Sequence, residues 1–152
     1  ILGPKPVIET MHALKEKIDL HTSSLDQEIA YRIMKESAFQ DHIEELCINY
    51  GQKGQAMMKA MHKFLPNFSF EDPKGGFFLW VQLPKDCSGV EYLNFCLEEK
   101  VAFVPGQPFY PDKDNDAFIR MAFPAVRQEV LEEGLQRMAT AYGRYEEYLK
   151  NN

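Results

Sequence analysis

The stretch that decides the fold is Ala117-Phe118-Ile119-Arg120-Met121-Ala122-Phe123, an apolar run with one charge inside it. Successive side chains of an extended strand point to opposite faces, so Phe118, Arg120 and Ala122 share one face. Arginine is rarely buried alone, because an unpaired guanidinium in the interior is very costly. Its planar fork suits two-pronged binding of a carboxylate. The strand therefore needs an anion, which comes either from an acidic side chain of the protein or from a ligand.

The segments before this strand predict a small sheet that follows one long helix. Apolar positions three and four residues apart run from Phe39 to Leu65 and predict about seven helical turns, or about 40 Å, ending at Pro66. Short strands are expected at 68–70 and 101–104. The double glycine at 75–76 opens a further strand over 77–83, whose apolar character is typical of a strand covered on both faces. We expect an α+β fold in which a small mixed or antiparallel sheet packs with helices, preceded by the long helix.

Local signals place the remaining helices. A helix is expected over 7–19, and the turn after it offers Ser24 or Asp26 as the cap of the next helix. A capping box at 88–91 opens a helix through Glu99, and the last helix begins near Gln128. Residues 1–37 do not fit the small lobe and read as the tail of a larger domain, whereas 38–152 form a small domain. The helical positions expected to face the core include Cys47, Leu93, Cys96, Leu97 and Val130.

Composition argues against several classes of protein. The 152 residues carry a net charge of −6 with an isoelectric point near 5.2, which disfavours a nucleic-acid-binding surface. The longest apolar runs are far shorter than the roughly 20 residues that span a membrane. Three cysteines without a CxxC spacing and four scattered histidines predict no metal site. Reduced thiols in a cytoplasmic protein are the expected state.

An ordered set of motifs resembles a known family. The set consists of GGFFLW at 75–80, VAFVPG at 101–106, FYP at 109–111, IRMAF at 119–123 and a helix containing EEGL at 132–135. Together they resemble the C-terminal part of the pyridoxal-phosphate-dependent aminotransferases of fold type I, classes I and II. The resemblance is closest to the branch that acts on 2-aminoadipate and kynurenine.

The resemblance implies an activity and a set of site residues. The activity is amino-group transfer between an amino acid and a 2-oxo acid, with pyridoxal 5'-phosphate as cofactor. Arg120 would grip the substrate's α-carboxylate, and Gly76 and Gly106 would line the substrate site. Thr22 and Ser23 would reach the cofactor phosphate of the partner subunit in a homodimer.

The first residues read like the end of a strand entering a turn. In the resembled family such a strand follows the lysine that binds the cofactor covalently. We therefore expect a C-terminal fragment that holds no catalytic residue and is inactive by itself.

Several alternatives stay open at this point. The hydroxyls of Thr22 and Ser23 could serve simply as helix caps. Arg120 could serve as one half of an internal ion pair. The chain is also compatible with an aminotransferase-like effector domain of a transcription regulator, or with a standalone α+β interaction module.

Overall fold

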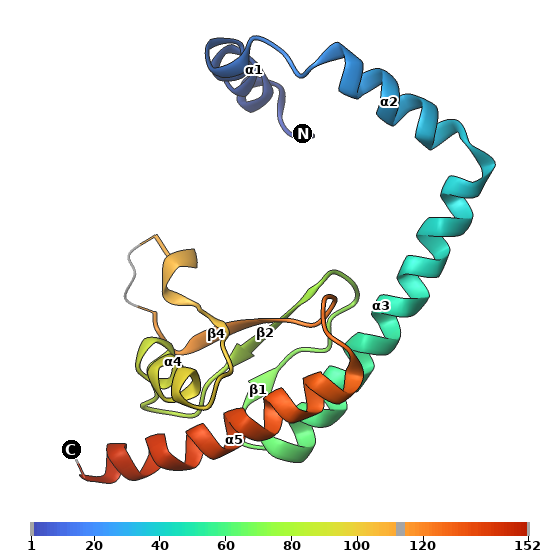
Figure 1. Cartoon of the computed structure of the whole chain (residues 1–152). Coiled ribbons are helices and arrows are strands. Elements are labelled where there is room, and N and C mark those ends of the chain that lie inside the picture. Colours follow the sequence, from blue (N-terminus) through green and yellow to red (C-terminus); the bar gives the residue numbers. More distant parts are fainter. Residues whose placement is uncertain (1, 112–114, 152) are drawn as a thin grey trace. The chain divides into compact units, whose positions relative to one another are not determined.

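The computed structural model in Figure 1 describes residues 2–111 and 115–151. The chain divides into two compact units, Ile1–Glu45 and Leu46–Asn152, and the boundary falls inside the long helix α3 (Ser37–Phe64). This division concerns packing within the chain alone. The expectation that residues 1–37 belong to a larger cofactor-binding domain stays a prediction.

The first unit consists of α1 (Lys5–Asp19), α2 (Ser24–Lys35) and the start of α3. The hydroxyl of Ser23 caps α2 by accepting a hydrogen bond from the backbone N–H of Asp26 at 3.4 Å. The reading of the Ser23 hydroxyl as a helix cap is thus confirmed, whereas the caps expected at Ser24 or Asp26 were wrong because both residues already lie within α2. The expected strand end is also wrong for residues 2–4, which lie outside any strand, while residue 1 lies outside the described residues.

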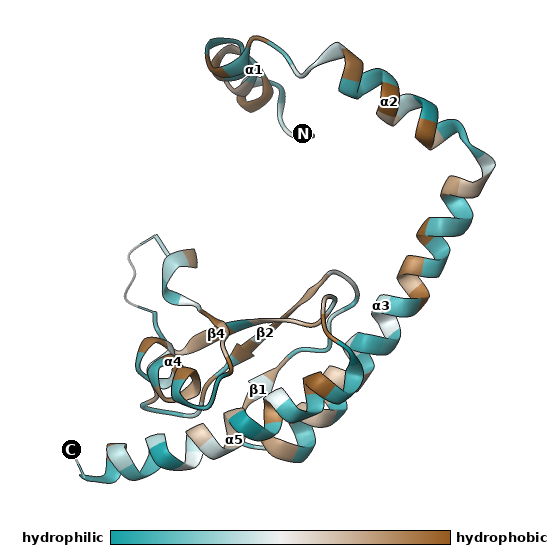
Figure 2. Cartoon of the chain, in the orientation of Figure 1, coloured by the Kyte–Doolittle hydropathy of each residue, from teal (hydrophilic) through white to brown (hydrophobic). Residues whose placement is uncertain are grey.

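The helices α1 and α2 leave their apolar stripes uncovered. Figure 2 shows hydrophobic residues along both helices, and neither helix has a buried residue among those described. An amphipathic helix normally turns such a stripe toward a core. Among the described residues no core covers these stripes, whose larger exposed members are Val7, Met11, Leu14, Ile18, Leu25, Ile29 and Ile33.

The long helix α3 agrees with its predicted extent and ends just before Pro66. In the second unit it buries Met57, Ala60 and Met61. Gly54 lies on the same buried side, where a Cβ atom would meet the ring of Phe123 at 3.5 Å. Gly51 and Gly54 both lie inside α3 and belong to its regular helical backbone.

The sheet is antiparallel with strand order β1-β2-β4-β3, which confirms the expected small α+β layer. Its strands are β1 (Ser69–Phe70), β2 (Phe78–Gln82), β3 (Val104–Pro105) and β4 (Phe118–Ala122). The strand expected over 101–104 was misplaced, because only its last residue pairs with β4. In the central pair, Trp80 lies opposite Arg120.

Helices cover one face of this sheet. The C-terminal half of α3, α4 (Gly89–Glu98) and α5 (Gln128–Asn151) share a core with alternate residues of β2 and β4. On the strands, the core residues are Leu79, Val81, Ile119 and Met121. The prediction that β2 is covered on both faces was wrong for the described chain, since Phe78 is 45% exposed. We call the covered side the inner face and the other side the outer face.

Three positions assigned to the core are exposed instead. Leu97 of α4 is 54% exposed and Val130 of α5 is 44% exposed, and Cys47 is exposed near the start of the second unit. Periodicity shows which side of a helix is apolar but not how wide the covered stripe is. Tyr92 takes the central place in α4 and is fully buried, with its hydroxyl donating to the carbonyl of Met138 at 2.7 Å.

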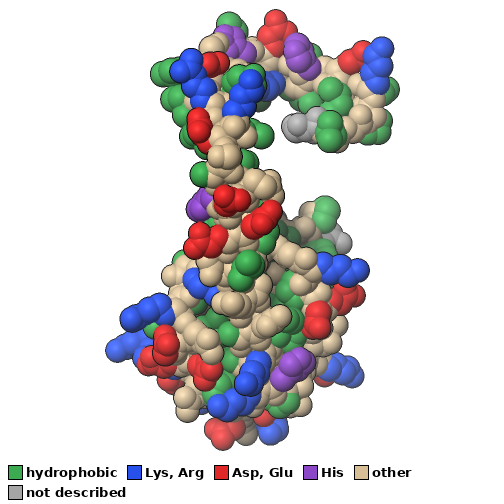
Figure 3. All heavy atoms as spheres, turned by 90° about the vertical axis from the view of Figure 1, so that its right-hand side faces the viewer, with side chains coloured by type: hydrophobic (Ala, Val, Ile, Leu, Met, Phe, Trp, Pro, Cys, Tyr) green, Lys and Arg blue, Asp and Glu red, His purple; other side chains and the backbone are tan. Residues whose placement is uncertain are grey.

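The described residues contain neither a membrane-spanning helix nor a cluster of metal ligands. No helix among them is long and apolar enough to cross a membrane. Within residues 2–111 and 115–151, no group of three or more His, Cys, Asp or Glu side chains is placed to hold a metal ion. On the face seen in Figure 3, acidic and basic side chains are interspersed, with hydrophobic side chains among them.

Candidate functional site

The outer face of β2 and β4 gathers aromatic side chains around one arginine. Phe78 and Trp80 of β2 lie on this face with Phe118 and Arg120 of β4, because they alternate with the core positions. The alternation predicted for the Arg120 strand is confirmed: Ile119, Met121 and Phe123 are buried, while Phe118 and Arg120 are half-buried.

The guanidinium of Arg120 contacts aromatic rings, and none of the described residues is its anionic partner. Its Cζ lies 4.3 Å from the ring centroid of Phe78 and 4.7 Å from that of Phe109. Its Nε is buried without a hydrogen-bond partner. Among the residues that the structure describes, no carboxylate forms an ion pair with it. The internal ion pair considered from the sequence is thus absent from the described part of the chain.

A half-buried guanidinium that has no carboxylate partner among the described residues can bind an anion. A cavity of about 400 Å³ opens on this side of the sheet, lined by Phe78, Trp80 and Phe118 together with polar residues of the β1 segment such as Glu71. Mostly apolar walls with a few polar groups are typical of small-molecule sites. Arg120 supplies donors in a fork that matches a carboxylate.

Gly106 has a structural task in the same region. Its backbone N–H donates to the carbonyl oxygen of Phe118 at 2.7 Å. A Cβ at Gly106 would lie only 2.7 Å from that oxygen, so the close approach of the two backbones requires glycine. The approach places the short 3-10 helix η1 (Gln107–Phe109) beside β4 and brings Phe109 to Arg120. A contact of Gly106 with substrate stays a prediction.

Gly76 has a different reason to be glycine. Its φ of 88° lies in the left-handed region, which other residues rarely adopt. A Cβ added there would meet no atom within 4 Å, so the turn that opens β2 faces open space. The structure leaves room beside this turn, and a substrate contact of Gly76 also stays a prediction.

Thr22 and Ser23 lie in the turn before α2. The Ser23 hydroxyl caps this helix, and the Thr22 carbonyl oxygen accepts a hydrogen bond from Nε2 of Gln27 at 2.8 Å. A hydroxyl that accepts one hydrogen bond still has its own hydrogen to donate, and the N-terminus of a helix favours an anion. The turn therefore has donors that fit a phosphate, while the proposed contact across a dimer stays a prediction.

A hydrogen-bond network fixes the entry to β4. The hydroxyl of Ser88 accepts from the backbone N–H of Glu91 at 3.1 Å and donates to the carboxylate of Asp116. Asp116 also accepts from the backbone N–H of Val90 at 3.2 Å, and its carbonyl oxygen accepts from that of Gly89. The N-terminus of α4 is thus tied to the residue that leads into the Arg120 strand.

Only half of the predicted capping box is present. Glu91 does not return to the backbone N–H of Ser88; instead the buried hydroxyl of Tyr145 accepts from that N–H at 3.0 Å and donates to Glu91 at 2.9 Å. Burial raises the pKa of Tyr145 to about 12, which keeps its hydroxyl protonated as a donor.

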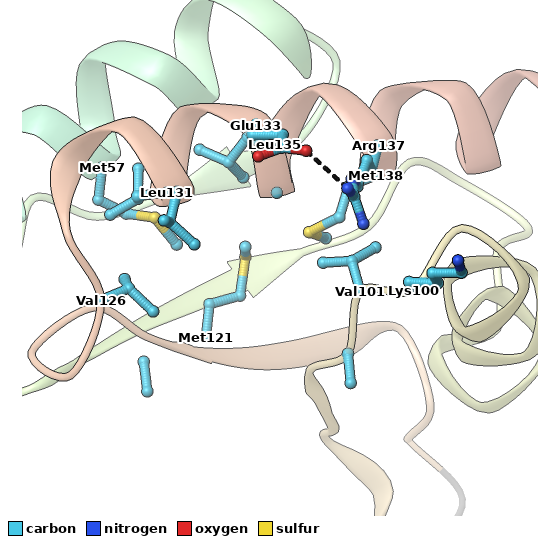
Figure 4. A pocket seen from close by; sticks show the side chains of 14 residues that line it. Met57, Lys100, Val101, Met121, Val126, Leu131, Glu133, Leu135, Arg137 and Met138 are labelled. Carbon is cyan, nitrogen blue, oxygen red and sulfur yellow. Dashed lines mark hydrogen bonds and ion pairs between the residues drawn. The ribbon is translucent and has the colours of Figure 1, made fainter.

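A second cavity lies on the opposite side of β4. It has a volume of about 340 Å³ and opens between α5 and the segment after α4 (Figure 4). Its walls are apolar, with Met57, Met121 and Met138 among them, and Glu133 and Arg137 pair at 2.6 Å on its rim. Because Met121 alternates with Arg120 along β4, this cavity is separate from the arginine site.

Sequence reasoning missed the two phenylalanines that contact the guanidinium. For Phe78 a signal was available, since it alternates with Leu79 and so shares a face with Trp80. For Phe109 there was none, because its position depends on how η1 approaches β4.

Comparisons with known proteins identify the family of this chain. The family model "Aminotransferase class I and II" matches residues 1–138. The chain belongs to the class I and II aminotransferases. Within this family, it is 35% identical over 128 residues to the 2-aminoadipate transaminase of Thermus thermophilus, a match that covers 84% of this chain and 32% of that protein.

One solved structure and one transcriptional regulator are also similar to this chain. The kynurenine aminotransferase structure from Pyrococcus horikoshii, in complex with PMP, superposes with a TM-score of 0.84 at 30% identity, covering 93% of this chain and 35% of that one. An uncharacterised HTH-type transcriptional regulator of Bacillus subtilis, YdfD, is 26% identical over 139 residues, covering 91% of this chain and 28% of that protein. The chain thus spans about a third of the length of these aminotransferases.

Proposed function

We propose that this chain is the C-terminal part of a pyridoxal-phosphate-dependent aminotransferase that exchanges an amino group between an amino acid and a 2-oxo acid. Its task there is to bind the substrate's α-carboxylate through Arg120. The observation that carries the proposal is the guanidinium on the outer face, which lies in an aromatic surround with a buried, unpartnered Nε and no described carboxylate beside it. Both substrates of such an exchange carry the carboxylate that this group suits.

Pyridoxal 5'-phosphate, when bound, supplies the electron sink of the reaction. We propose that Thr22 and Ser23 donate to its phosphate in the partner subunit of a homodimer, and that Gly76 and Gly106 border the substrate. Neither the lysine that binds the cofactor nor an acidic partner of its ring is assigned in this chain; Lys53, for example, donates to the carbonyl of Pro124. The parent enzyme is proposed to be cytoplasmic.

The proposal predicts that the chain alone is inactive. After incubation of the 152 residues with pyridoxal phosphate, borohydride reduction and peptide mapping should show no single labelled lysine, and amino-acid turnover should be absent. Stoichiometric labelling of one lysine together with turnover would contradict the assignment of the chain as a part.

The decisive test compares two amino donors in the longer enzyme that contains this chain. Arg120→Ala should weaken use of an α-amino acid by about 2–5 kcal/mol, and Arg120→Lys should rescue it poorly, because an ammonium lacks the two-pronged grip. An amine without the α-carboxylate should be a poor substrate of the wild type and change little in either variant. Equal losses for both donors in kcat/KM would show that Arg120 serves the scaffold and not the carboxylate.

A second candidate rests on the match to the transcriptional regulator. We propose as this alternative that the same fold senses an amino acid or cofactor behind a DNA-binding domain. The parent sequence decides between the two, because the regulator requires a helix-turn-helix segment upstream. In that case the Arg120 variants would alter ligand-dependent DNA binding instead of turnover.

A further inference from the structure

The two rings that meet the guanidinium of Arg120 come from separate parts of the fold. Phe78 belongs to β2 and Phe109 to η1, and their ring centroids lie 4.3 Å and 4.7 Å from Cζ. Both distances are within the range of a cation–π contact. Both rings are also about half exposed, at 45% and 48%, so burying apolar surface in the core does not account for their presence. We call them the aromatic pair.

The fold places each ring by a different device. In the register of β2 and β4, Phe78 lies opposite Ala122, which makes it a diagonal neighbour of Arg120 on the same face. Phe109 reaches the guanidinium because η1 is held against β4 by the bond from Gly106 to Phe118. The ring of Phe109 is further supported by Trp80, which it meets edge-on at 5.5 Å.

The absence of a described ion pair gives these contacts their importance. Arginine has a long side chain with many rotamers, and ordering it costs conformational entropy. Carboxylate side chains commonly provide that order, but none among the described residues pairs with Arg120. Aromatic faces can hold the plane of a guanidinium without occupying its hydrogen-bonding edge.

From this geometry we infer that Phe78 and Phe109 are positioning residues, which immobilise the Arg120 guanidinium and keep its N–H edge free for a ligand carboxylate. The inference rests on the proposed function for the identity of the ligand. It goes beyond that function because it assigns the fixed orientation of the guanidinium to two side chains that need not touch the substrate.

The test uses the Nε–H proton of Arg120, which NMR detects as a side-chain signal of the 152-residue chain. Its exchange with water, measured without ligand, reports how firmly the buried Nε is held. Titration with pyruvate, the smallest 2-oxo acid, reports carboxylate binding, and methyl pyruvate is the probe without the charge. The variants are Phe78→Leu and Phe109→Leu, with Phe109→Trp as the conservative replacement.

Phe77→Leu is the matched control. Phe77 is 49% exposed and adjacent to Phe78, but its ring meets Tyr50 at 5.0 Å and does not contact the guanidinium. We expect faster Nε–H exchange in both leucine variants and a pyruvate Kd raised by about three- to tenfold in each. Phe77→Leu and Phe109→Trp should resemble the wild type in both measurements.

Nε–H exchange tests whether the aromatic pair positions Arg120, and pyruvate binding tests whether Arg120 binds a carboxylate. If the leucine variants exchange and bind like Phe77→Leu, the aromatic pair does not position Arg120 and the inference is overturned. If exchange accelerates in them but pyruvate does not shift the wild-type signal more than methyl pyruvate does, the pair positions the arginine and the carboxylate assignment fails. Melting curves of all variants should agree closely, since the substituted rings are half exposed.

Discussion

The inner and outer faces of the β2–β4 pair differ by a single step along each strand. On the inner face, Leu79 and Ile119 are buried under three helices. On the outer face, Phe78 lines a cavity, and its diagonal neighbour Arg120 has no ionic partner among the described residues. The same strands thus present a buried, apolar face to the core on one side and a half-exposed face with aromatic rings and one arginine on the other. A site on such a support needs few residues of its own to stay in place.

The largest expected difference between the faces is in stability. Leu79→Ala should lower the free energy of unfolding by about 2–5 kcal/mol, because it opens a cavity in a packed core. Phe78→Ala on the outer face should cost about 1 kcal/mol, since the ring is already half exposed. Urea unfolding of both variants measures the difference. Equal losses would mean that the outer face is covered in solution.

A pH experiment tests the inner face in another way. Burial raises the pKa of Cys96 to about 12 from its ordinary value of 9.0, so the folded state holds the proton more tightly than the unfolded state does. This contribution is complete below pH 9.0 and is lost as pH rises toward about 12. The slope reaches about 1.4 kcal/mol per pH unit. Melting temperatures between pH 8 and 11 should fall less steeply for Cys96→Ala than for wild type.

Cys47 provides the control for this experiment, because it is exposed. Cys47→Ala should leave the slope unchanged. A slope that is the same in all three proteins would show that Cys96 does not titrate with unfolding. Thiol counting on the denatured, unreduced protein should return three free cysteines.

The hydrogen bonds of Ser88 connect α4, which covers the inner face, to the entry of β4. Their contribution to stability should be smaller than that of the core and can be measured separately. Ser88→Ala removes the cap of α4 and the bond to Asp116 at the entry to β4, so it should cost about 1 kcal/mol. Thr140→Ala is the comparison, since that hydroxyl bonds only to the carbonyl of Gln136 within α5. Its cost should stay within about 0.5 kcal/mol. A negligible effect of Ser88→Ala in chemical denaturation would mean that Tyr145 and Asp116 hold the junction without it.

The smallest expected effect belongs to the outer face itself. Arg120→Leu should change the free energy of unfolding by about 0.5 kcal/mol or less, because no described carboxylate pairs with Arg120 and would lose its partner. Guanidinium chloride would screen charges, so urea is the suitable denaturant. A loss above about 2 kcal/mol would reveal an ion pair and return Arg120 to a structural role.

The sequence predicted helices and strands well where the spacing of apolar residues along one segment determines the structure. The extent of α3 and the alternation around Arg120 follow from apolar spacing, and both were confirmed. It failed where distant packing decides: Leu97 lies on an apolar stripe of α4 but outside the covered part, and Phe78 looked like a core residue. Hydrophobicity does not tell which face of a strand receives the helices.

The arginine site was foreseen only in part. The unusual charge in an apolar strand pointed to Arg120, but the lack of an ion pair with any described carboxylate depends on the whole fold. The place of Phe109 follows from a backbone contact between η1 and β4, for which no residue pattern exists. The roles of Gly76, Gly106, Thr22 and Ser23 in binding remain predictions.

The way η1 is fastened has a consequence for how this region tolerates change. The backbone of Gly106 bonds to that of Phe118, and the N–H groups of Phe109 and Tyr110 bond to carbonyls within the same turn. No side chain of the turn takes part in these bonds, so its residues can be replaced without releasing it. The path of the chain through η1 therefore depends on backbone hydrogen bonds and a single glycine, and a change of one side chain there should alter the surface beside β4 without moving the turn.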